Sequence, residues 1–147
     1  MRDEYLGNEQ ASWDAFLQVV VSVPADKRTD PSVVPGWSVK DLVWHCAGWT
    51  TFAGDHLEQI RDGTFVDPFE NVPDSHWDEV SQQMIDESRA MSFEDVVAGA
   101  ERARERARTI WSALPTIDAE AGKLFADETF SHYDEHTDEI RRFTNPA

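Results

Sequence analysis

Two histidines, His132 and His136, stand four residues apart in the segment FSHYDEHTDEIRRF. Residues at this spacing lie one above the other on an α-helix, so the two imidazoles can chelate one metal ion. The same spacing also occurs on solvated helix faces, and the motif alone is weak evidence for a metal site. Here the pair lies within an apolar stripe, which favours a metal site. The stripe consists of Phe125, Thr129, His132, His136, Ile140 and Phe143.

A third imidazole is available at His45, in the segment GWSVKDLVWHCAGW. If its helix neighbours the helix of the histidine pair, three neutral imidazoles can hold one ion and leave positions open for water or substrate. Such a site suits Zn, Ni or Fe, and the spacing does not choose among them. The alternative for His45 is a core histidine with one hydrogen-bond partner. His56 lies roughly 16 Å further along the helix, and Cys46 points about 100° away, so neither is expected to be a ligand.

Three carboxylates lie one helical turn from the three histidines. They are Asp41, Glu128 and Glu139. Metal-bound histidines commonly donate their second ring nitrogen to such a group, which makes these residues candidate partners. Asp41 has a competing role as the partner of a helix N-cap. Glu128 is also the candidate general base, because it could reach a ligand on the ion.

The segments that must position these residues have helical periodicity, and no alternating strand pattern competes with it. Long helices are expected at about residues 5–23, 38–61, 93–114 and 124–143, and a shorter one at about 75–89. Pro24 and Pro115 end two of them, while Ser38 and Ser92 each begin an S-x-x-D helix start. The sequence therefore predicts an all-α fold, an up-down four-helix bundle with an extra short helix in the middle crossover, and a single domain over residues 1–147.

Composition and charge exclude several classes of partner. With 29 acidic against 13 basic side chains and a formal net charge of −16, the chain would repel a phosphate backbone, so no nucleic-acid partner is expected. The run of Arg102, Arg104, Arg106 and Arg108 spreads around its helix and predicts a solvated surface. No apolar window approaches a membrane span, and the charged N-terminus lacks a leader-like apolar region. A single cysteine fits a reducing compartment, and we expect a cytoplasmic protein.

The segments VPGWSVKDLVWHCAGW and ETFSHYDEHTDEIRRF resemble the DinB-like four-helix-bundle superfamily. Its relatives include the N-terminal domains of mycothiol-dependent maleylpyruvate isomerases and small stress and self-resistance proteins. The resemblance covers nearly the whole chain in helix order. Its specific part is Gly36, Trp37, Asp41, His45, His132, Tyr133, His136 and Ile140.

In that family one histidine of the second helix and two residues of the last long helix bind a divalent metal. The resemblance therefore implies ligation by His45, His132 and His136. The isomerase branch can carry glutamate at the position of His132, and some of the small resistance proteins dispense with the metal. The presence of all three histidines favours the metal-bound branch.

The resemblance implies a metal-dependent enzyme in which Zn or Ni activates a thiol or water for attack on a small electrophilic substrate. The chain offers no suitably placed cysteine, so the thiol would be a cosubstrate such as mycothiol or bacillithiol; with water the protein would be a hydrolase. Two alternatives stay open: a metal-free protein that sequesters a small molecule, and a structural ion with function at an interface. The sequence does not decide whether the protein is an enzyme. Phe65, Val66 and Phe69 either contact a second copy in a homodimer or cover the end of the bundle.

Overall fold

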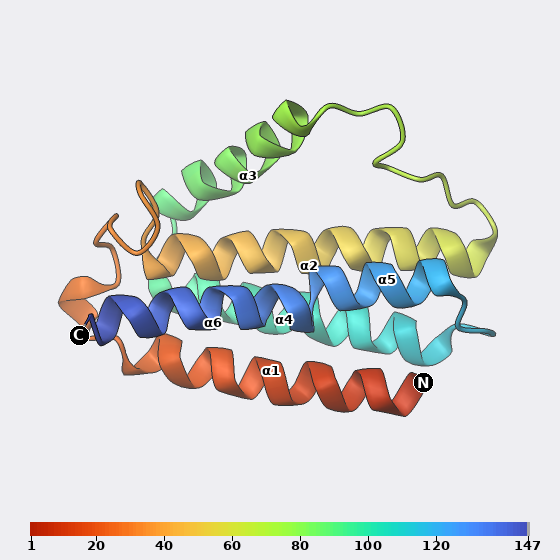
Figure 1. Cartoon of the computed structure of the whole chain (residues 1–147), viewed down its shortest axis with the longest axis horizontal. Coiled ribbons are helices and arrows are strands. Elements are labelled where there is room, and N and C mark those ends of the chain that lie inside the picture. The colour runs from red at the N-terminus through yellow and green to blue at the C-terminus, as the bar shows by residue number, and fades with distance from the viewer. Residues whose placement is uncertain (147) are drawn as a thin grey trace.

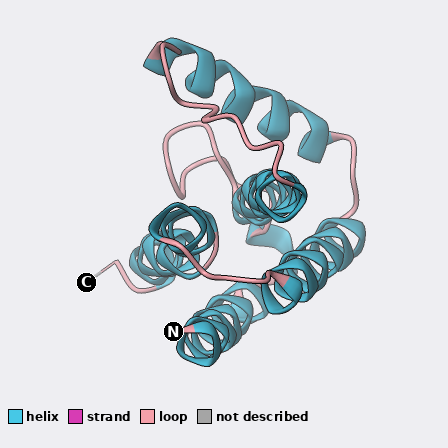
Figure 2. Cartoon of the chain, turned by 90° about the vertical axis from the view of Figure 1, so that its right-hand side faces the viewer, coloured by secondary structure: helices cyan, strands magenta, loops and turns pink. Residues whose placement is uncertain are grey.

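The computed structural model describes residues 1–146, and within that range the chain forms helices and loops without a β-strand. The α-helices are α1 (Arg2–Ser22), α2 (Val39–Asp62), α3 (Asp74–Arg89), α4 (Phe93–Ala113), α5 (Ala119–Glu128) and α6 (Phe130–Thr144), with a short 3-10 helix, η1 (Ala25–Lys27), after α1. Helices α1, α2, α4 and the α5–α6 pair form the bundle, and α3 lies outside it (Figures 1 and 2). The predicted all-α four-helix bundle with an extra crossover helix is confirmed, whereas the predicted up-down order does not hold for α2 and α4, which run in the same direction (Figure 1). In the described range no helix has the length and hydropathy needed to cross a bilayer.

Helix α2 is the central helix of the bundle, and it packs beside α4, with which it is parallel (Figure 1). The crossover through α3 returns the chain to the starting end of α2 before α4 begins, which makes this parallel arrangement necessary. Apolar residues of α1, α2, α4 and α6 form one core cluster, centred on Phe16, Leu42 and Tyr133. A second cluster, around Leu57, Trp111 and Phe125, joins α2, α4 and α5. The two clusters hold α2 and α6 on the same side of the molecule, where the site lies.

The helix ends follow the local signals in the sequence. The Ser38 hydroxyl accepts a bond from the Asp41 backbone N–H (3.1 Å), and the Asp41 carboxylate accepts one from the Ser38 N–H (2.9 Å), which completes a capping box. At the start of α4 the Ser92 hydroxyl likewise accepts the backbone N–H of Asp95 (3.0 Å), without the reciprocal bond. Gly63 ends α2 in the left-handed region with φ of 75°, where a side chain would be strained.

Asp41 has a second partner that gives a testable prediction. Its other carboxylate oxygen accepts a bond from the buried hydroxyl of Ser88, which ties α3 to the start of α2. We expect Asp41→Ala to lower the free energy of unfolding by about 2 kcal/mol, because it removes a cap partner and leaves a buried hydroxyl with one bond fewer. Asp95→Ala is the matched control, since Asp95 holds the same position in α4 but is exposed. Urea unfolding of both variants measures the difference, and equal losses would contradict the inter-helix role.

The predicted range of the last helix is wrong. Two helices replace the single one expected over residues 124–143, and they meet at Thr129, whose φ of −122° and ψ of −95° lie outside the helical region. Thr129 is fully buried, and its hydroxyl donates to the carbonyl of Phe125 at 2.6 Å, a bond that competes with the helix backbone. Helix α5 also starts earlier than predicted, because Asp118 caps it by accepting the N–H of Ala121 at 2.8 Å.

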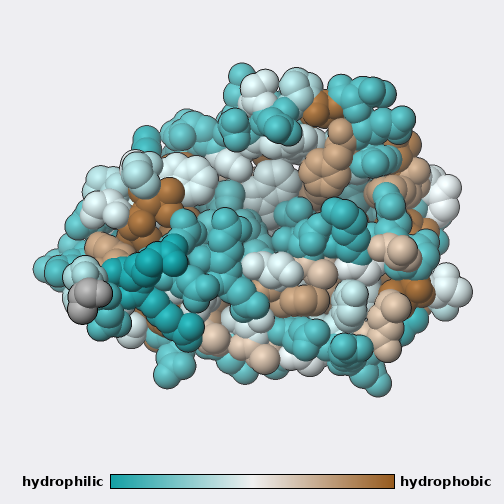
Figure 3. All heavy atoms as spheres, in the orientation of Figure 1, coloured by the Kyte–Doolittle hydropathy of each residue, from teal (hydrophilic) through white to brown (hydrophobic). Residues whose placement is uncertain are grey.

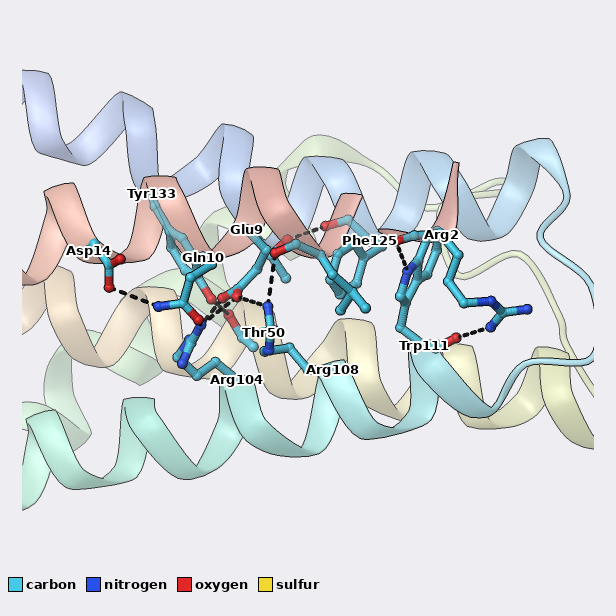
Figure 4. A network of polar contacts seen from close by, with 12 residues as sticks. Arg2, Glu9, Gln10, Asp14, Thr50, Arg104, Arg108, Trp111, Phe125 and Tyr133 are labelled. Carbon is cyan, nitrogen blue, oxygen red and sulfur yellow. Dashed lines mark hydrogen bonds and ion pairs between the residues drawn. The ribbon is translucent and has the colours of Figure 1, made fainter. Parts of the chain in front are cut away.

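The prediction of a solvated arginine helix is wrong for Arg104 and Arg108. Arg104 is buried and donates two bonds to the carboxylate of Glu9, at 2.9 and 2.6 Å. Arg108 donates to the same carboxylate at 2.7 Å, so Glu9 lies between two guanidinium groups (Figure 4). Glu9 is itself fully buried on α1 and faces α4. The periodicity of α4 alone could not reveal this carboxylate, which belongs to a different helix.

Candidate metal centre

Helices α2 and α6 bring the three predicted histidines together. The Nε2 atom of His132 lies 3.0 Å from Nε2 of His45 and 2.9 Å from Nε2 of His136. The nitrogens that could act as ligands all lie within 4.8 Å of one another. His45 and His136 are buried, and His132 is half-buried. The arrangement could hold a metal ion, and ligation by these residues stays a prediction.

The chemistry of the three rings fits a shared cation. A ring nitrogen has one in-plane position, which is either an N–H donor or a lone pair, so His132 Nε2 cannot make good hydrogen bonds to both neighbours. A cation between the three lone pairs would satisfy them together. Two nitrogens on one tetrahedral zinc ion lie roughly 3.4 Å apart, given Zn–N bonds of about 2.1 Å, and the two Nε2 distances to His132 are within roughly 0.5 Å of this value.

Two of the three histidines, His45 and His132, are held in the uncharged form that binds metals. Burial, followed by the charge of the nearby His136, lowers the pKa of His45 to about 3. Burial, followed by the charges of His136 and His45, also holds the pKa of His132 well below its ordinary value. At neutral pH both rings therefore present lone pairs without losing a proton first.

Only one of the three histidines has a hydrogen-bond partner on its Nδ1 atom in the described part of the chain. Glu139 accepts a bond from Nδ1 of His136, which confirms one predicted partner. Asp41 is engaged with Ser38 and Ser88, and no contact joins Glu128 to His132, whose i, i+4 relation is interrupted at Thr129. The predictions of Asp41 and Glu128 as partners are wrong. The Nδ1 atoms of His45 and His132 are buried and have no hydrogen-bond partner among residues 1–146.

The bond between Glu139 and His136 is expected to affect metal affinity. A carboxylate on Nδ1 fixes the ring orientation and raises the basicity of Nε2, so we expect Glu139→Gln to weaken metal binding by about 10- to 100-fold. Competition with a chromophoric chelator measures the dissociation constants. Asp138→Asn, an exposed neighbour on α6, is the control and should leave affinity unchanged. If the two variants bound metal alike, Glu139 would have no supporting role.

The histidines form part of the wall of a cavity of about 560 Å³. Aromatic side chains from the loop before α2, from α2, from the crossover and from α3 line it: Trp37, Trp49, Phe69 and Trp77. A neighbouring cavity of about 490 Å³ shares Phe69, Asp127 and Glu128 with it. Hydrophilic side chains cover most of the face on which α5 and α6 lie, and apolar ones gather towards the crossover (Figure 3).

Three tryptophans lie close to His45 in the sequence, and two of them line the cavity. These are Trp37 and Trp49, whereas the indole N–H of Trp44 donates to Glu87 at 3.0 Å, away from the cavity. The crossover and α3 contribute Phe69 and Trp77, which sequence reasoning did not assign to the site. The only signal in the sequence for these two residues was the high density of aromatic residues in that segment.

Glu128 lines both cavities and has an unusual acidity. Burial raises its pKa to about 7, with a smaller contribution from the charge of Asp127, while Lys123 acts in the opposite direction. The folded protein therefore keeps a proton between pH 4.5 and 7 that the unfolded chain has lost. The free energy of unfolding consequently falls as pH rises through this window.

Glu128→Gln should remove this pH-dependent loss. At pH 8 we expect the variant to be more stable than the wild type by about 1–3 kcal/mol, and near pH 4.5 the two should be equal. Urea unfolding of metal-free protein at both pH values measures the difference. Glu120→Gln, an exposed change on α5, is the control. A gain of equal size at both pH values would show that burial of the charge is not its cause.

Comparisons with known proteins agree with this architecture. The family model of the mycothiol maleylpyruvate isomerase N-terminal domain matches residues 10–123, a range that includes His45 and ends before α6. The crystal structure of an uncharacterised protein from Escherichia coli UTI89 superposes with a TM-score of 0.83 at 16% sequence identity, over 99% of this chain and 94% of that chain. At this identity the likeness shows the fold alone. No curated protein sequence matches the chain.

Proposed function

The chain belongs to the mycothiol maleylpyruvate isomerase N-terminal domain family, and on this premise we propose that it is a divalent-metal-dependent enzyme acting on a small electrophilic molecule. The proposed reaction is transfer of a low-molecular-weight thiol, or an isomerisation that the thiol assists. The observation that carries the proposal is the convergence of three Nε2 atoms at the wall of an aromatic cavity. The fold and the family match support the reaction class, and the histidines support the metal.

His45, His132 and His136 would hold one ion, with Zn or Ni as the proposed metals. When bound, such an ion supplies Lewis-acid chemistry that lowers the pKa of a thiol or a water molecule to near neutrality. Glu128, whose pKa of about 7 suits proton transfer at neutral pH, would take or return a proton at the cavity wall. The aromatic side chains would exclude bulk water from the reacting groups.

The thiol would come from a cosubstrate. Cys46 is fully buried in the core, and burial raises its pKa well above the ordinary value, so this residue is a poor nucleophile. The two adjoining cavities, of about 560 and 490 Å³, fall in the size range of small-molecule sites and leave room for a thiol beside its acceptor. With water in place of the thiol, the same site would perform hydrolysis.

The test of the proposal is thiol-dependent conversion of an electrophilic acceptor by metal-loaded protein. Zn- or Ni-loaded protein should accelerate this conversion when mycothiol is supplied, with loss of free thiol in a transfer and without net loss in an isomerisation, and chelator-treated protein should not. Glu128→Gln should lower this rate by about 100-fold without changing the metal content. One bound ion per chain without turnover of mycothiol, cysteine or a hydrolysable ester would contradict the enzymatic proposal and favour a structural ion.

A second candidate is a metal-free protein that binds or sequesters a small molecule in the same cavity. The observation that favours it is the pair of Nδ1 atoms, on His45 and His132, that lack the hydrogen-bond partners usual for tight metal ligands. It predicts that ligand binding survives alanine substitution of the histidines. Metal-dependent turnover would exclude it.

Homodimerisation and a cytoplasmic location stay predictions. Val66 is 72% exposed, which leaves it available for a second copy. Phe65 and Phe69 line a cavity of the chain itself, which supports the alternative that they cover the end of the bundle. Sedimentation of the Val66→Asp variant beside the wild type would distinguish these roles.

A further inference from the structure

The cavity beside the histidines has a strongly one-sided charge. Five carboxylates line it: Asp74, Asp127, Glu128, Glu135 and Glu139. No lysine or arginine is among its lining residues in the described part of the chain. The neighbouring cavity contains Lys123, but this ammonium group pairs with Asp127 at 2.8 Å and its charge is therefore offset. Because Asp127 is paired with Lys123 and Glu128 is only partly ionised at pH 7, a divalent ion on the histidines would offset most of the remaining negative charge, and the excess of negative charge is largest in the metal-free protein.

Two of the carboxylates have no role in holding the fold together. Asp74 and Glu135 are exposed side chains, and neither has a hydrogen-bond or ion-pair partner within residues 1–146. By contrast, Glu139 is bound to His136 and Asp127 to Lys123. Two uncompensated charges at the mouth of one cavity raise the local concentration of cations and repel anions.

Four aromatic rings line the same cavity as these carboxylates. The ring centroids of Trp49 and Trp77 lie 5.7 Å apart and those of Trp77 and Phe69 lie 5.1 Å apart, so the three form a continuous wall. Trp37 adds a fourth ring 5.0 Å from that of His45. Aromatic faces attract ammonium groups through their quadrupole, most strongly in tryptophan.

A separate observation indicates that this cavity takes a ligand. His45 is only 6% exposed and lines the cavity, yet its Nδ1 atom has no hydrogen-bond partner in the described chain. Buried polar atoms are rarely left unsatisfied, so the unpaired Nδ1 at this wall favours an occupant that offers it a hydrogen-bond partner. An ammonium group cannot accept a bond from Nδ1–H, so this partner would be another group of the same molecule, such as the carbonyl oxygen of an electrophile.

We infer that the small molecule bound beside the three histidines is an organic cation, one with an ammonium group held between the aromatic wall and the carboxylates and without a carboxylate of its own. This deepens the proposed function and rests on it, since it names the substrate class of the same site. The family name refers to maleylpyruvate, a dicarboxylate, for which this cavity offers no basic side chain. The chain is therefore inferred to have a different substrate from the one in that name.

The test uses three probes of similar size and different charge: benzyltrimethylammonium, benzyl alcohol and benzoate. The quaternary ammonium can neither ligate a metal nor donate a hydrogen bond, so its binding reports charge and aromatic contact. Each probe is titrated into 15N-labelled protein, and the indole N–H signals of the six tryptophans are followed. Trp37, Trp49 and Trp77 line the cavity and should shift, while Trp13, Trp44 and Trp111 lie outside it and are internal references.

In metal-free protein the cation should bind at least about fivefold more tightly than the alcohol, and benzoate should bind most weakly. Glu135→Gln should weaken binding of the cation by about two- to fivefold and leave the alcohol unaffected. Asp134→Asn, an exposed neighbour outside the cavity, is the matched control. Benzoate binding as tightly as the cation, or an equal effect of Glu135→Gln on all three probes, would overturn the inference.

The titrations are repeated with Zn-loaded protein, because a bound ion could attract a carboxylate. The inference requires that the cation still binds more tightly than benzoate, and the reverse order would overturn it for the working enzyme. None of the probes reacts with a thiol. A protein that prefers the cation but converts no electrophile in the presence of a thiol would therefore contradict the proposed reaction alone, and one that catalyses such a conversion but prefers benzoate would contradict the substrate class alone.

Discussion

Replacing His132 with alanine is expected to abolish stoichiometric metal binding. His132 is the central histidine of the group, since its Nε2 lies within 3.0 Å of the corresponding atoms of both His45 and His136. Its loss leaves two imidazoles, and two ligands alone rarely hold an ion tightly. The loss of affinity should exceed the roughly 10- to 100-fold effect of removing an outer partner of a ligand. His45→Ala should have a similar effect, because it removes the imidazole that α2 contributes to the group.

Plasma mass spectrometry of untagged protein, loaded with Zn or Ni and then dialysed, measures this effect as ions per chain. The wild type should retain about one, as expected for one three-histidine site. His76→Ala is the matched control, because His76 is an exposed histidine of α3 outside the group. Retention of a full ion by His132→Ala would assign the metal to other residues. A wild type that binds neither metal would favour the sequestration protein.

Replacing Glu9 with alanine is expected to cause the largest loss of stability. Glu9 is 0% exposed and accepts bonds from both Arg104 and Arg108, so its removal leaves a buried guanidinium group without its counter-charge. Breaking a buried ion pair from one side costs about 3–5 kcal/mol. Arg104 also lies over the ring of Trp13, with its Cζ 5.2 Å from the centroid, so the pair is part of the packing between α1 and α4.

Urea unfolding of Glu9→Ala measures this loss, with the exposed Glu4→Gln of the same helix as the control. The double variant Glu9→Leu, Arg104→Met should be more stable than Glu9→Ala, because it removes the buried charges of the pair together. This comparison separates the cost of an unpaired charge from the loss of side-chain volume. A double variant less stable than the single one would show that the pair itself contributes the stability.

The sequence by itself determined the features that depend on neighbours along the chain. Helical periodicity gave the four long apolar faces and placed His132 and His136 on the same side of one helix. The S-x-x-D patterns at Ser38 and Ser92 predicted helix starts that the structure confirms. These features are local because a cap or a turn involves residues only three or four positions apart.

Only the tertiary structure decided which groups from different helices meet. Periodicity gives the face of a helix but not its partner, so the approach of His45 to His132 required α2 and α6 to pack side by side. The same reason explains why Arg104, predicted to be solvated, is buried against Glu9 of α1. It also explains the contribution of Trp77 to the cavity, since α3 lies against α2 only after the crossover has turned back. The site is assembled by packing between helices, which a single helix pattern does not contain.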